Sequence, residues 1–280
     1  MYGKDIIKRE ICFIYVGLLK TYDEVISYLE DNNYSEFTDY WYPCREIKLD
    51  GSCSYSDLYG NEYNGENYKI DITLINGGKL YIDNECELSN VKIQVYDMSE
   101  VEIEDNVKIK GESVIRCKFQ SKISLSRNIG TIGYGKICAS FNSNINIGED
   151  FSFGSIHIES NQNSKIVIGN DCMASWDVVI RAGNGHHIFD METGKNLCAI
   201  GRNVIIGDHV WIGQRATLFS GCEIGNGSIV GINTFVNKKF PSNCSIAGNP
   251  ARIIKENVAW RRESYPYFDS YDDFADFDFR

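Results

Sequence analysis

Apolar residues recur every six positions over much of the second half of the chain, with one interruption after Ile180. The repeated positions are Ile168, Ala174, Ile180, Ile200, Ile206, Ile212, Leu218, Ile224, Val230 and Val236. A second set of small or apolar residues follows most of these by four positions: Cys172, Val178, Val204, Val210, Ala216, Cys222, Ser228 and Thr234. Neither a helical period nor strand alternation produces this double register. The pattern predicts a parallel β-helix, in which three short flat faces per coil surround a narrow core.

A longer repeat precedes the hexads and begins near Leu80. Its unit is apolar-x-apolar with another apolar residue four positions later, and its copies lie 21 or 22 residues apart. The copies are Leu80-Ile82-Cys86, Val101-Ile103-Val107, Ile123-Leu125-Ile129, Ile145-Ile147-Phe151 and Ile166-Ile168-Cys172. Because three hexads make a coil of about 18 residues, we expect each longer coil to carry three or four extra residues, at a corner. Seven or eight coils at the ~4.8 Å spacing of strands make a prism of about 35 Å.

Three regions follow from this pattern. Residues 1–64 lack the repeat and predict a small amino-terminal α/β module, with a short helix after the capping-box pair Thr21 and Glu24. The β-helix is expected over residues 65–255. Residues 256–280 predict a short helix starting at Glu256 and then an acidic aromatic tail, which is either packed or disordered. The fold class is therefore all-β, a β-helix whose open sheet edges are covered by the two flanking segments.

Charge and cysteine content restrict the partners. The net charge of −11 argues against a nucleic-acid groove, which needs clustered cations. An anionic substrate would need a local basic site in this acidic chain. The 10 cysteines contain no C-x-x-C pair, and several fall at core positions, so we expect buried thiols in a reducing cytoplasm. The apolar run Ile11–Leu19 is too short to cross a bilayer, and no membrane span is expected.

Three motifs occur in a fixed order in and after the repeat. They are Gly185-His186-His187-Ile188-Phe189-Asp190, Ile206-Gly207-Asp208-His209-Val210-Trp211-Ile212-Gly213 and Ala247-Gly248-Asn249-Pro250-Ala251-Arg252. With them the sequence resembles the left-handed parallel β-helix acyltransferases with hexapeptide repeats. Within that family it is most similar to O-acetyltransferases of bacterial capsule and surface polysaccharides, including those that act on sialic acid. The resemblance implies left-handed coils, a homotrimer with sites in the clefts between prisms, acetyl-CoA as co-substrate, and no metal.

The loop from Arg181 to Cys198 interrupts an otherwise regular coil. Ordering such a loop costs entropy and adds nothing to the core, which favours a functional role. Acetyl transfer to an alcohol needs a general base, for which His is suited near neutral pH. By the resemblance the base is His186, with His187 and Asn184 near the substrate. Two alternatives stay open, namely that His187 is the base, or that the loop His only forms local hydrogen bonds.

Two further residues are candidates for the catalytic site. Asp190 either orients the base or forms a turn. The hexad register points Trp211 outward, and an exposed Trp on a flat coil marks a contact surface. By the resemblance Trp211 lies beside acetyl-CoA and the acceptor, and the alternative is an aromatic residue at the trimer interface. His209 is expected at the surface or an interface.

The cofactor residues are expected in the carboxyl-terminal coils. By the resemblance, the contacts to the pantetheine arm come from Gly213, Gln214, Gly231, Ile232, Asn237 and Lys238. Lys238, Arg252 and Lys255 are expected to neutralise the phosphates of acetyl-CoA. The segment between Lys238 and Lys255 contains basic residues and no acidic one, which favours this role.

The sequence thus predicts direct transfer from acetyl-CoA to a hydroxyl of a bacterial surface glycan. The main alternative is an N-acetyltransferase of an amino sugar or sugar nucleotide, which the sequence separates poorly. A β-helix zinc hydratase would need three His ligands, and the four His of the chain lack that spacing. A catalytically silent scaffold does not explain the His186 loop, and a nucleotidyltransferase lacks its Gly-rich phosphate loop in residues 1–64.

Overall fold

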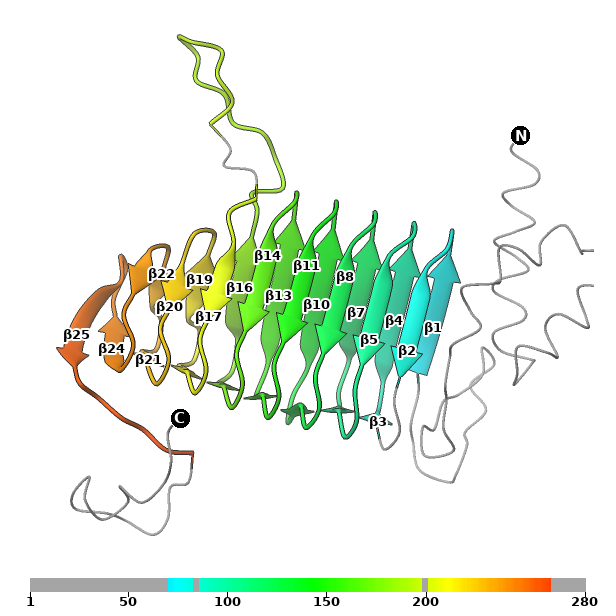
Figure 1. The fold of residues 1–280 in the computed structure, drawn as a ribbon, viewed down its shortest axis with the longest axis horizontal. Helices are drawn as coiled ribbons and strands as arrows, with labels where there is room; N and C mark the ends of the chain where they lie inside the picture. Colours follow the sequence, from blue (N-terminus) through cyan, green and yellow to red (C-terminus); the bar gives the residue numbers. More distant parts are fainter. Residues whose placement is uncertain (1–69, 83–85, 198–200, 263–280) are drawn as a thin grey trace, which may run out of the picture.

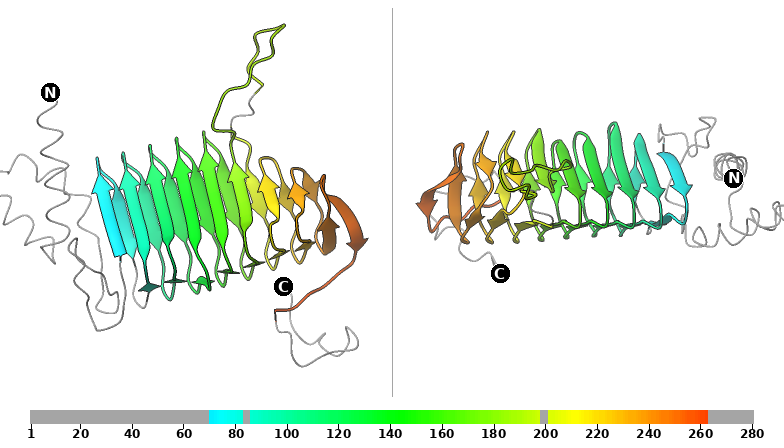
Figure 2. Two further views of the ribbon diagram at one scale, coloured as in Figure 1. Left: turned by 180° about the vertical axis from the view of Figure 1, so that it is seen from behind. Right: turned by 90° about the horizontal axis from the view of Figure 1, so that it is seen from above.

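The computed structural model describes residues 70–82, 86–197 and 201–262. These residues form a long prism of stacked coils, from which one loop projects (Figures 1 and 2). Its strands are β1 to β25, and the described residues include no helix. The expected amino-terminal module (residues 1–64) and the acidic tail from Glu263 lie outside the described residues.

Each coil contributes one strand to each of three sheets, so neighbours within a sheet are three strands apart in the sequence and pair in parallel, except that β25 pairs with β24 in antiparallel fashion. Sheet A contains β1 (Ile70–Ile75), β4 (Val91–Tyr96), β7 (Ser113–Lys118), β10 (Gly135–Ser140), β13 (Ile156–Asn161), β16 (Val178–Ala182), β19 (Thr217–Phe219) and β22 (Phe235–Val236). Sheet B contains β2 (Lys79–Ile82), β5 (Glu100–Ile103), β8 (Lys122–Leu125), β11 (Asn144–Ile147), β14 (Lys165–Ile168), β17 (Val204–Ile206), β20 (Glu223–Ile224) and β23 (Lys239–Phe240). Sheet C contains β3 (Glu87–Leu88), β6 (Lys108–Ile109), β9 (Gly130–Thr131), β12 (Ser152–Phe153), β15 (Met173–Ala174), β18 (Trp211–Ile212), β21 (Ile229–Val230), β24 (Cys244–Ala247) and β25 (Arg252–Glu256).

The core is a single column of inward side chains along the prism. Every described member of the two predicted hexad sets is buried, from Ile168 to Val236. Ile200 lies outside the described residues. Eight stacked strands in sheets A and B confirm the expected number of coils.

The extra residues of the longer coils lie at the corner between sheets A and B. Ile115 and Ile123 stand eight positions apart, whereas their counterparts in a regular coil, Leu218 and Cys222, stand four apart. At this corner the side chains of Ser99, Ser121, Ser143 and Ser164 are buried in a ladder. The Oγ of Ser99 accepts a hydrogen bond from the Ser121 N–H at 3.1 Å, and Ser121 accepts one from Ser143 in the same way. The prediction of a corner insertion is thereby confirmed.

The chain after Pro250 pairs as a strand. β25 is antiparallel to β24 and covers the last edge of sheet C, which confirms the expected cover at this end. The predicted helix from Glu256 is wrong for the described residues, because the free N–H and C=O groups of β24 pair with this segment. Asn257 then takes a left-handed conformation, with φ of 55°, and residues 258–262 run back along the prism.

Candidate active site

The loop that carries His186 leaves the prism at the corner between sheets A and B. It joins β16 to β17 and extends well beyond the coils (Figures 1 and 2). An antiparallel bridge between Phe189 and Asn196 closes its outer part into a hairpin. The Leu197 N–H donates to Ile188 O at 2.7 Å. Backbone pairing therefore holds the outer part of this loop in a hairpin.

Asp190 holds the turn at the tip of the hairpin. Its Oδ1 accepts hydrogen bonds from the N–H and the Oγ1 of Thr193, both at 2.7 Å, and from the Glu192 N–H at 3.1 Å. The Thr193 side chain and backbone lower the pKa of Asp190 below its ordinary value. Of the two roles considered for Asp190, these bonds correspond to the turn.

His186 and His187 are both exposed on this loop. The Nδ1 of His187 lies 3.0 Å from Asn196 Nδ2 inside the hairpin, whereas His186 stands at its base, beside Gly185. A guanidinium nitrogen of Arg181 lies 3.4 Å from where a Cβ on Gly185 would be. Arg181, which sequence reasoning treated only as the loop boundary, therefore reaches the base of the candidate catalytic loop.

The loop also exposes large apolar side chains. Ile188, Phe189 and Leu197 are each 56% exposed, and Met191 is 95% exposed. Exposed apolar surface of this kind marks a contact site in a soluble protein.

Trp211 lies on the other side of the prism. It belongs to β18 in sheet C and points outward as the register predicts, with 39% of its surface exposed. In a three-sided prism, sheet C is the face opposite the corner between sheets A and B, where His186 is attached (Figure 1). A single chain therefore does not bring His186 and Trp211 together.

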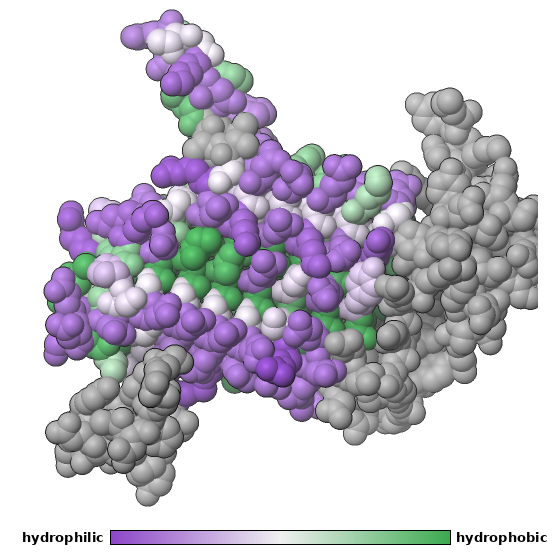
Figure 3. Space-filling model, viewed as in Figure 1, coloured by the Kyte–Doolittle hydropathy of each residue, from purple (hydrophilic) through white to green (hydrophobic). Residues whose placement is uncertain are grey.

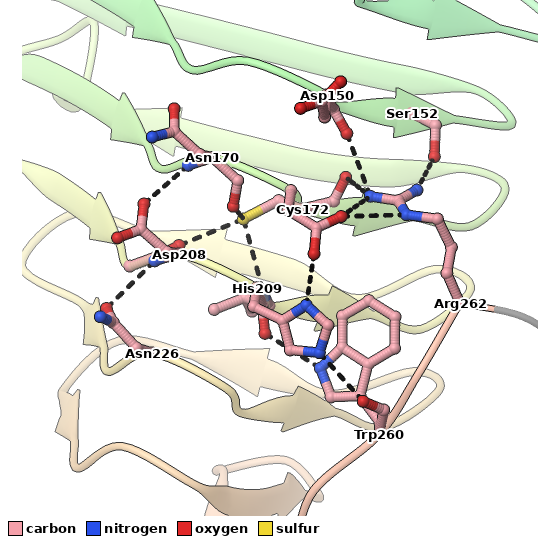
Figure 4. A network of polar contacts seen from close by, with 12 residues as sticks. Asp150, Ser152, Asn170, Cys172, Asp208, His209, Asn226, Trp260 and Arg262 are labelled. Atoms are coloured by element: carbon pink, nitrogen blue, oxygen red, sulfur yellow. Dashed lines mark hydrogen bonds and ion pairs between the residues drawn. The ribbon is translucent and has the colours of Figure 1, made fainter. Parts of the chain in front are cut away.

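A carboxyl-terminal strap, residues 258–262, runs beside Trp211 and is held by His209 (Figure 4). The His209 ring stacks on Trp260 at 4.1 Å between centroids, and Trp260 Nε1 donates to His209 O at 2.9 Å. His209 Nδ1 lies 2.6 Å from Asp171 Oδ2. Trp260 is in turn 6.0 Å from the Trp211 ring. His209 therefore lies at the surface of its coil, where an aromatic stack within the chain covers much of its ring.

Arg262 fastens the end of the strap. Its Nε and Nη2 donate to Asp171 Oδ1 at 3.1 and 2.9 Å, and Nη2 also reaches the carbonyl oxygens of Asp150 and Cys172, each at 3.0 Å. Its Nη1 donates to Ser152 Oγ. Sequence reasoning missed the contacts of Trp260 with Trp211 and of Arg262 with the coils, because it placed both residues in a helix.

The predicted cofactor residues occupy three places at the carboxyl-terminal end of the prism. Gly213, Gln214, Gly231 and Ile232 lie at the corner between sheets C and A. Asn237 and Lys238 lie at the corner between sheets A and B, after β22. Arg252 and Lys255 are exposed on β25. These residues belong to neighbouring coils at the same end of the prism, but they lie on different sides of it.

Trp176 was not singled out from the sequence, yet it lies at the same corner as Gln214. It is 44% exposed. Its carbonyl oxygen accepts a hydrogen bond at 2.9 Å from the N–H of Arg215, the residue after Gln214. A Cβ on Gly154 would meet its indole at 2.8 Å, so the ring lies flat over that glycine. An exposed Trp at a tight turn is the signal that could have marked it.

No group of three or more His, Cys, Asp and Glu side chains among the described residues is arranged to hold a metal ion. No helix long and apolar enough to cross a membrane occurs among these residues.

Comparisons with known proteins agree with this architecture. No family model matches the chain. A polysialic acid O-acetyltransferase of Neisseria meningitidis is 30% identical over 200 residues, 71% of this chain and 81% of the relative. One from Escherichia coli O1:K1 / APEC is 34% identical over 128 residues, 46% of this chain and 41% of the relative. The match to the second spans less than half of that protein.

The solved structures agree with these relatives. The polysialic acid O-acetyltransferase OatWY superposes with a TM-score of 0.65 at 29% identity, over 75% of this chain and 97% of its own. The chain belongs to the left-handed parallel β-helix acyltransferases with hexapeptide repeats. Within that family it is similar to polysialic acid O-acetyltransferases, among them NeuO, which superposes with a TM-score of 0.50 at 27% identity, over 72% of this chain and 92% of its own.

Proposed function

We propose that this acyltransferase is an acetyl-CoA-dependent O-acetyltransferase that acetylates a hydroxyl of a bacterial capsule or surface polysaccharide. The observation that carries the proposal is the exposed His186, held on an ordered loop that interrupts one coil of this acyltransferase fold. The similarity to polysialic acid O-acetyltransferases supports the acceptor class. The buried thiols of the described coils suit a reducing cytoplasm.

In the proposed reaction His186 acts as the general base. Its imidazole accepts the proton of the acceptor hydroxyl while that oxygen attacks the thioester carbonyl. Backbone N–H groups near the loop hold the tetrahedral oxyanion. The intermediate collapses with cleavage of the C–S bond, and the imidazolium returns its proton to the leaving thiolate. The acetyl group therefore passes directly to the glycan in a ternary complex.

We further propose that the site is completed between copies of the chain in a homotrimer. His186, Asn237 and Lys238 lie on the corner between sheets A and B, whereas Trp211 and Gln214 lie on the other side. A contact that joins two different surfaces of identical copies closes into a ring. The apolar side chains of the loop would be covered in that contact.

The residues near Gln214 suit the pantetheine arm of acetyl-CoA. A Cβ on Gly213 would meet Val230 O at 2.7 Å and Ile232 N at 2.8 Å, so the coil backbones approach closely there. Ile232 is 61% exposed beside it and offers apolar surface to the arm. The exposed cations Lys238, Arg252 and Lys255 match the charge of the CoA phosphates.

Release of free thiol from acetyl-CoA tests the reaction. We expect release to depend on a capsule oligosaccharide and to fall at least about a hundredfold in His186→Ala, the scale of a lost general base. His187→Ala is the matched control and should keep most of the activity, with acetyl-CoA binding unchanged in both variants. Release stimulated by amino-sugar nucleotides instead of glycans would favour the N-acetyltransferase.

A further inference from the structure

The outward face of sheet A carries an excess of basic side chains on its central strands. Its central strands β7, β10 and β16 carry Arg116, Lys118, Lys136 and Arg181, which we call the basic face. The one acidic side chain at the outward positions of β7, β10, β13 and β16 is Glu159. This excess of positive charge stands out in a chain whose net charge is −11.

Sheet B shows what a balanced face looks like. Lys122 bonds Glu100 at 2.7 Å and Glu102 at 3.1 Å, and Lys239 bonds Glu223 at 2.5 Å. The face seen in Figure 3 is hydrophilic along both edges and has a band of hydrophobic surface along its middle. Two lysines of sheet B are therefore neutralised by neighbouring glutamates, whereas the four cations of the basic face share the single carboxylate of Glu159.

Strand register arranges the basic face as a ladder along the prism. Arg116 pairs with Cys138, Cys138 with Glu159, and Glu159 with Arg181 in successive strands. Lys136 occupies the next outward row of β10. Neighbouring rungs are about 4.8 Å apart, the spacing of strands in a sheet. A ladder of this form can follow an extended polymer over several of its units.

The charges of the basic face converge on one region. Burial raises the pKa of the Cys138 thiol, while the nearby charges of Lys136, Arg116 and Lys118 lower it. Glu159 shares its carboxylate between Asn161 at 2.8 Å and Arg181 at 3.8 Å. Its pKa is lowered to about 2, chiefly by His157. One carboxylate therefore serves several cationic neighbours, so the face retains capacity for further anions.

The ladder ends at the candidate catalytic loop. Arg181 belongs to β16, the strand that leads directly into the loop, and its guanidinium lies against Gly185, the residue before His186. We infer that the basic face binds an anionic acceptor polysaccharide through its carboxylates and leads it to His186, an inference that rests on the proposed function. Three copies of this face turned toward a common axis would repel one another, which favours an outward orientation.

Binding measured without acetyl-CoA tests the inference. The probes are long polysialic acid oligomers, which carry carboxylates, neutral dextran oligomers of similar length, and a single-stranded oligonucleotide, all titrated into the full chain by anisotropy or calorimetry. We expect polysialic acid to bind, dextran not to bind, and added salt to weaken the complex. Arg116→Ala and Lys136→Ala should each raise the Kd about fivefold, the upper range for one exposed charge. Glu159→Gln should lower the Kd.

Lys165→Ala on sheet B removes the same charge from an exposed position outside the basic face and should leave the Kd unchanged. Melting temperatures of all variants confirm that they fold. In turnover, the basic-face variants should raise the KM for the acceptor while kcat stays constant. Equal weakening by Lys165→Ala, binding of the oligonucleotide as tight as that of the glycan, or an effect on kcat alone would overturn the inference.

The binding measurement tests this inference independently of the proposed function. His186→Ala should bind polysialic acid as the wild type does, because the base is not part of the ladder. If polysialic acid binding depends on the basic face but no glycan stimulates thiol release, the proposed function is refuted and the inferred binding site is retained. If only neutral glycans stimulate thiol release, the inference of an anionic acceptor is refuted and the proposed O-acetyltransferase activity is retained.

Discussion

At the scale of single residues, the thiols of the core are held neutral by their surroundings. Cys117, Cys172 and Cys222 are buried, and burial raises the pKa of each to about 12. Because a thiolate would be unsolvated there, these side chains act as small apolar residues. Cys138 differs, since it faces outward on sheet A and is half-buried.

Alkaline pH should therefore destabilise the protein. A thiol with a pKa of about 12 in the folded state and 9.0 in the unfolded chain contributes stability below pH 9 and loses it between pH 9 and 12, because only the unfolded chain releases the proton. Each such thiol costs about 1.4 kcal/mol per pH unit in that window. Urea unfolding of wild type and Cys222→Ala at pH 8 and 10 checks this. Parallel losses in both proteins would contradict it.

At the scale of elements, the strap shows how a segment without repeat pattern is fixed by side chains. Trp260 is 5% exposed, and Nε and Nη2 of Arg262 both donate to Asp171 Oδ1. The strap lies beside Trp211 and joins three neighbouring coils, through Asp150, Asp171 and His209. We infer that it stabilises the coils that carry the candidate site.

Removal of Arg262 should destabilise the chain. Arg262→Ala leaves several carbonyl and carboxylate acceptors unpaired, and we expect a loss of about 2 kcal/mol. Arg215 forms an exposed pair with Asp177 at 3.8 Å, so Arg215→Ala is the matched control and should cost less than about 0.5 kcal/mol. Thermal unfolding of both variants measures the difference. Equal melting temperatures would show that the strap contributes nothing.

At the scale of the whole molecule, the residues of the candidate site lie on opposite sides of one prism. His186 is attached at the corner between sheets A and B, and Trp211 lies on sheet C. The exposed apolar loop and this separation have one common explanation, a ring in which each loop reaches the next copy.

Mixed oligomers test this arrangement. His186→Ala and Trp211→Ala should each be nearly inactive alone. Refolded together in equal amounts, they should regain about a quarter of the wild-type activity, because that share of the interfaces combines an intact His186 with an intact Trp211. The same variants mixed without refolding serve as the control. No recovery after subunit exchange would place both residues in one copy's site.

The sequence alone determined the core of this protein. The period of six specified which side chains point inward, because each face of a coil buries the same positions whatever its neighbours are. The outward direction of Trp211 and the existence of a corner insertion followed from the same count. The motif around His186 marked the one interrupted coil.

Only the tertiary structure decided which residues are neighbours across coils. The 21- and 22-residue coils and the later 18-residue coils stack by strand register, and that register alone aligns Arg116, Glu159 and Arg181 into a ladder. It also separates His186 from Trp211. The free edge of β24 converted a helix-like segment into β25. The period in the sequence specifies which side chains point into the core and which point outward. Pairing between chain segments specifies which residues become neighbours in space, and the candidate site depends on that pairing.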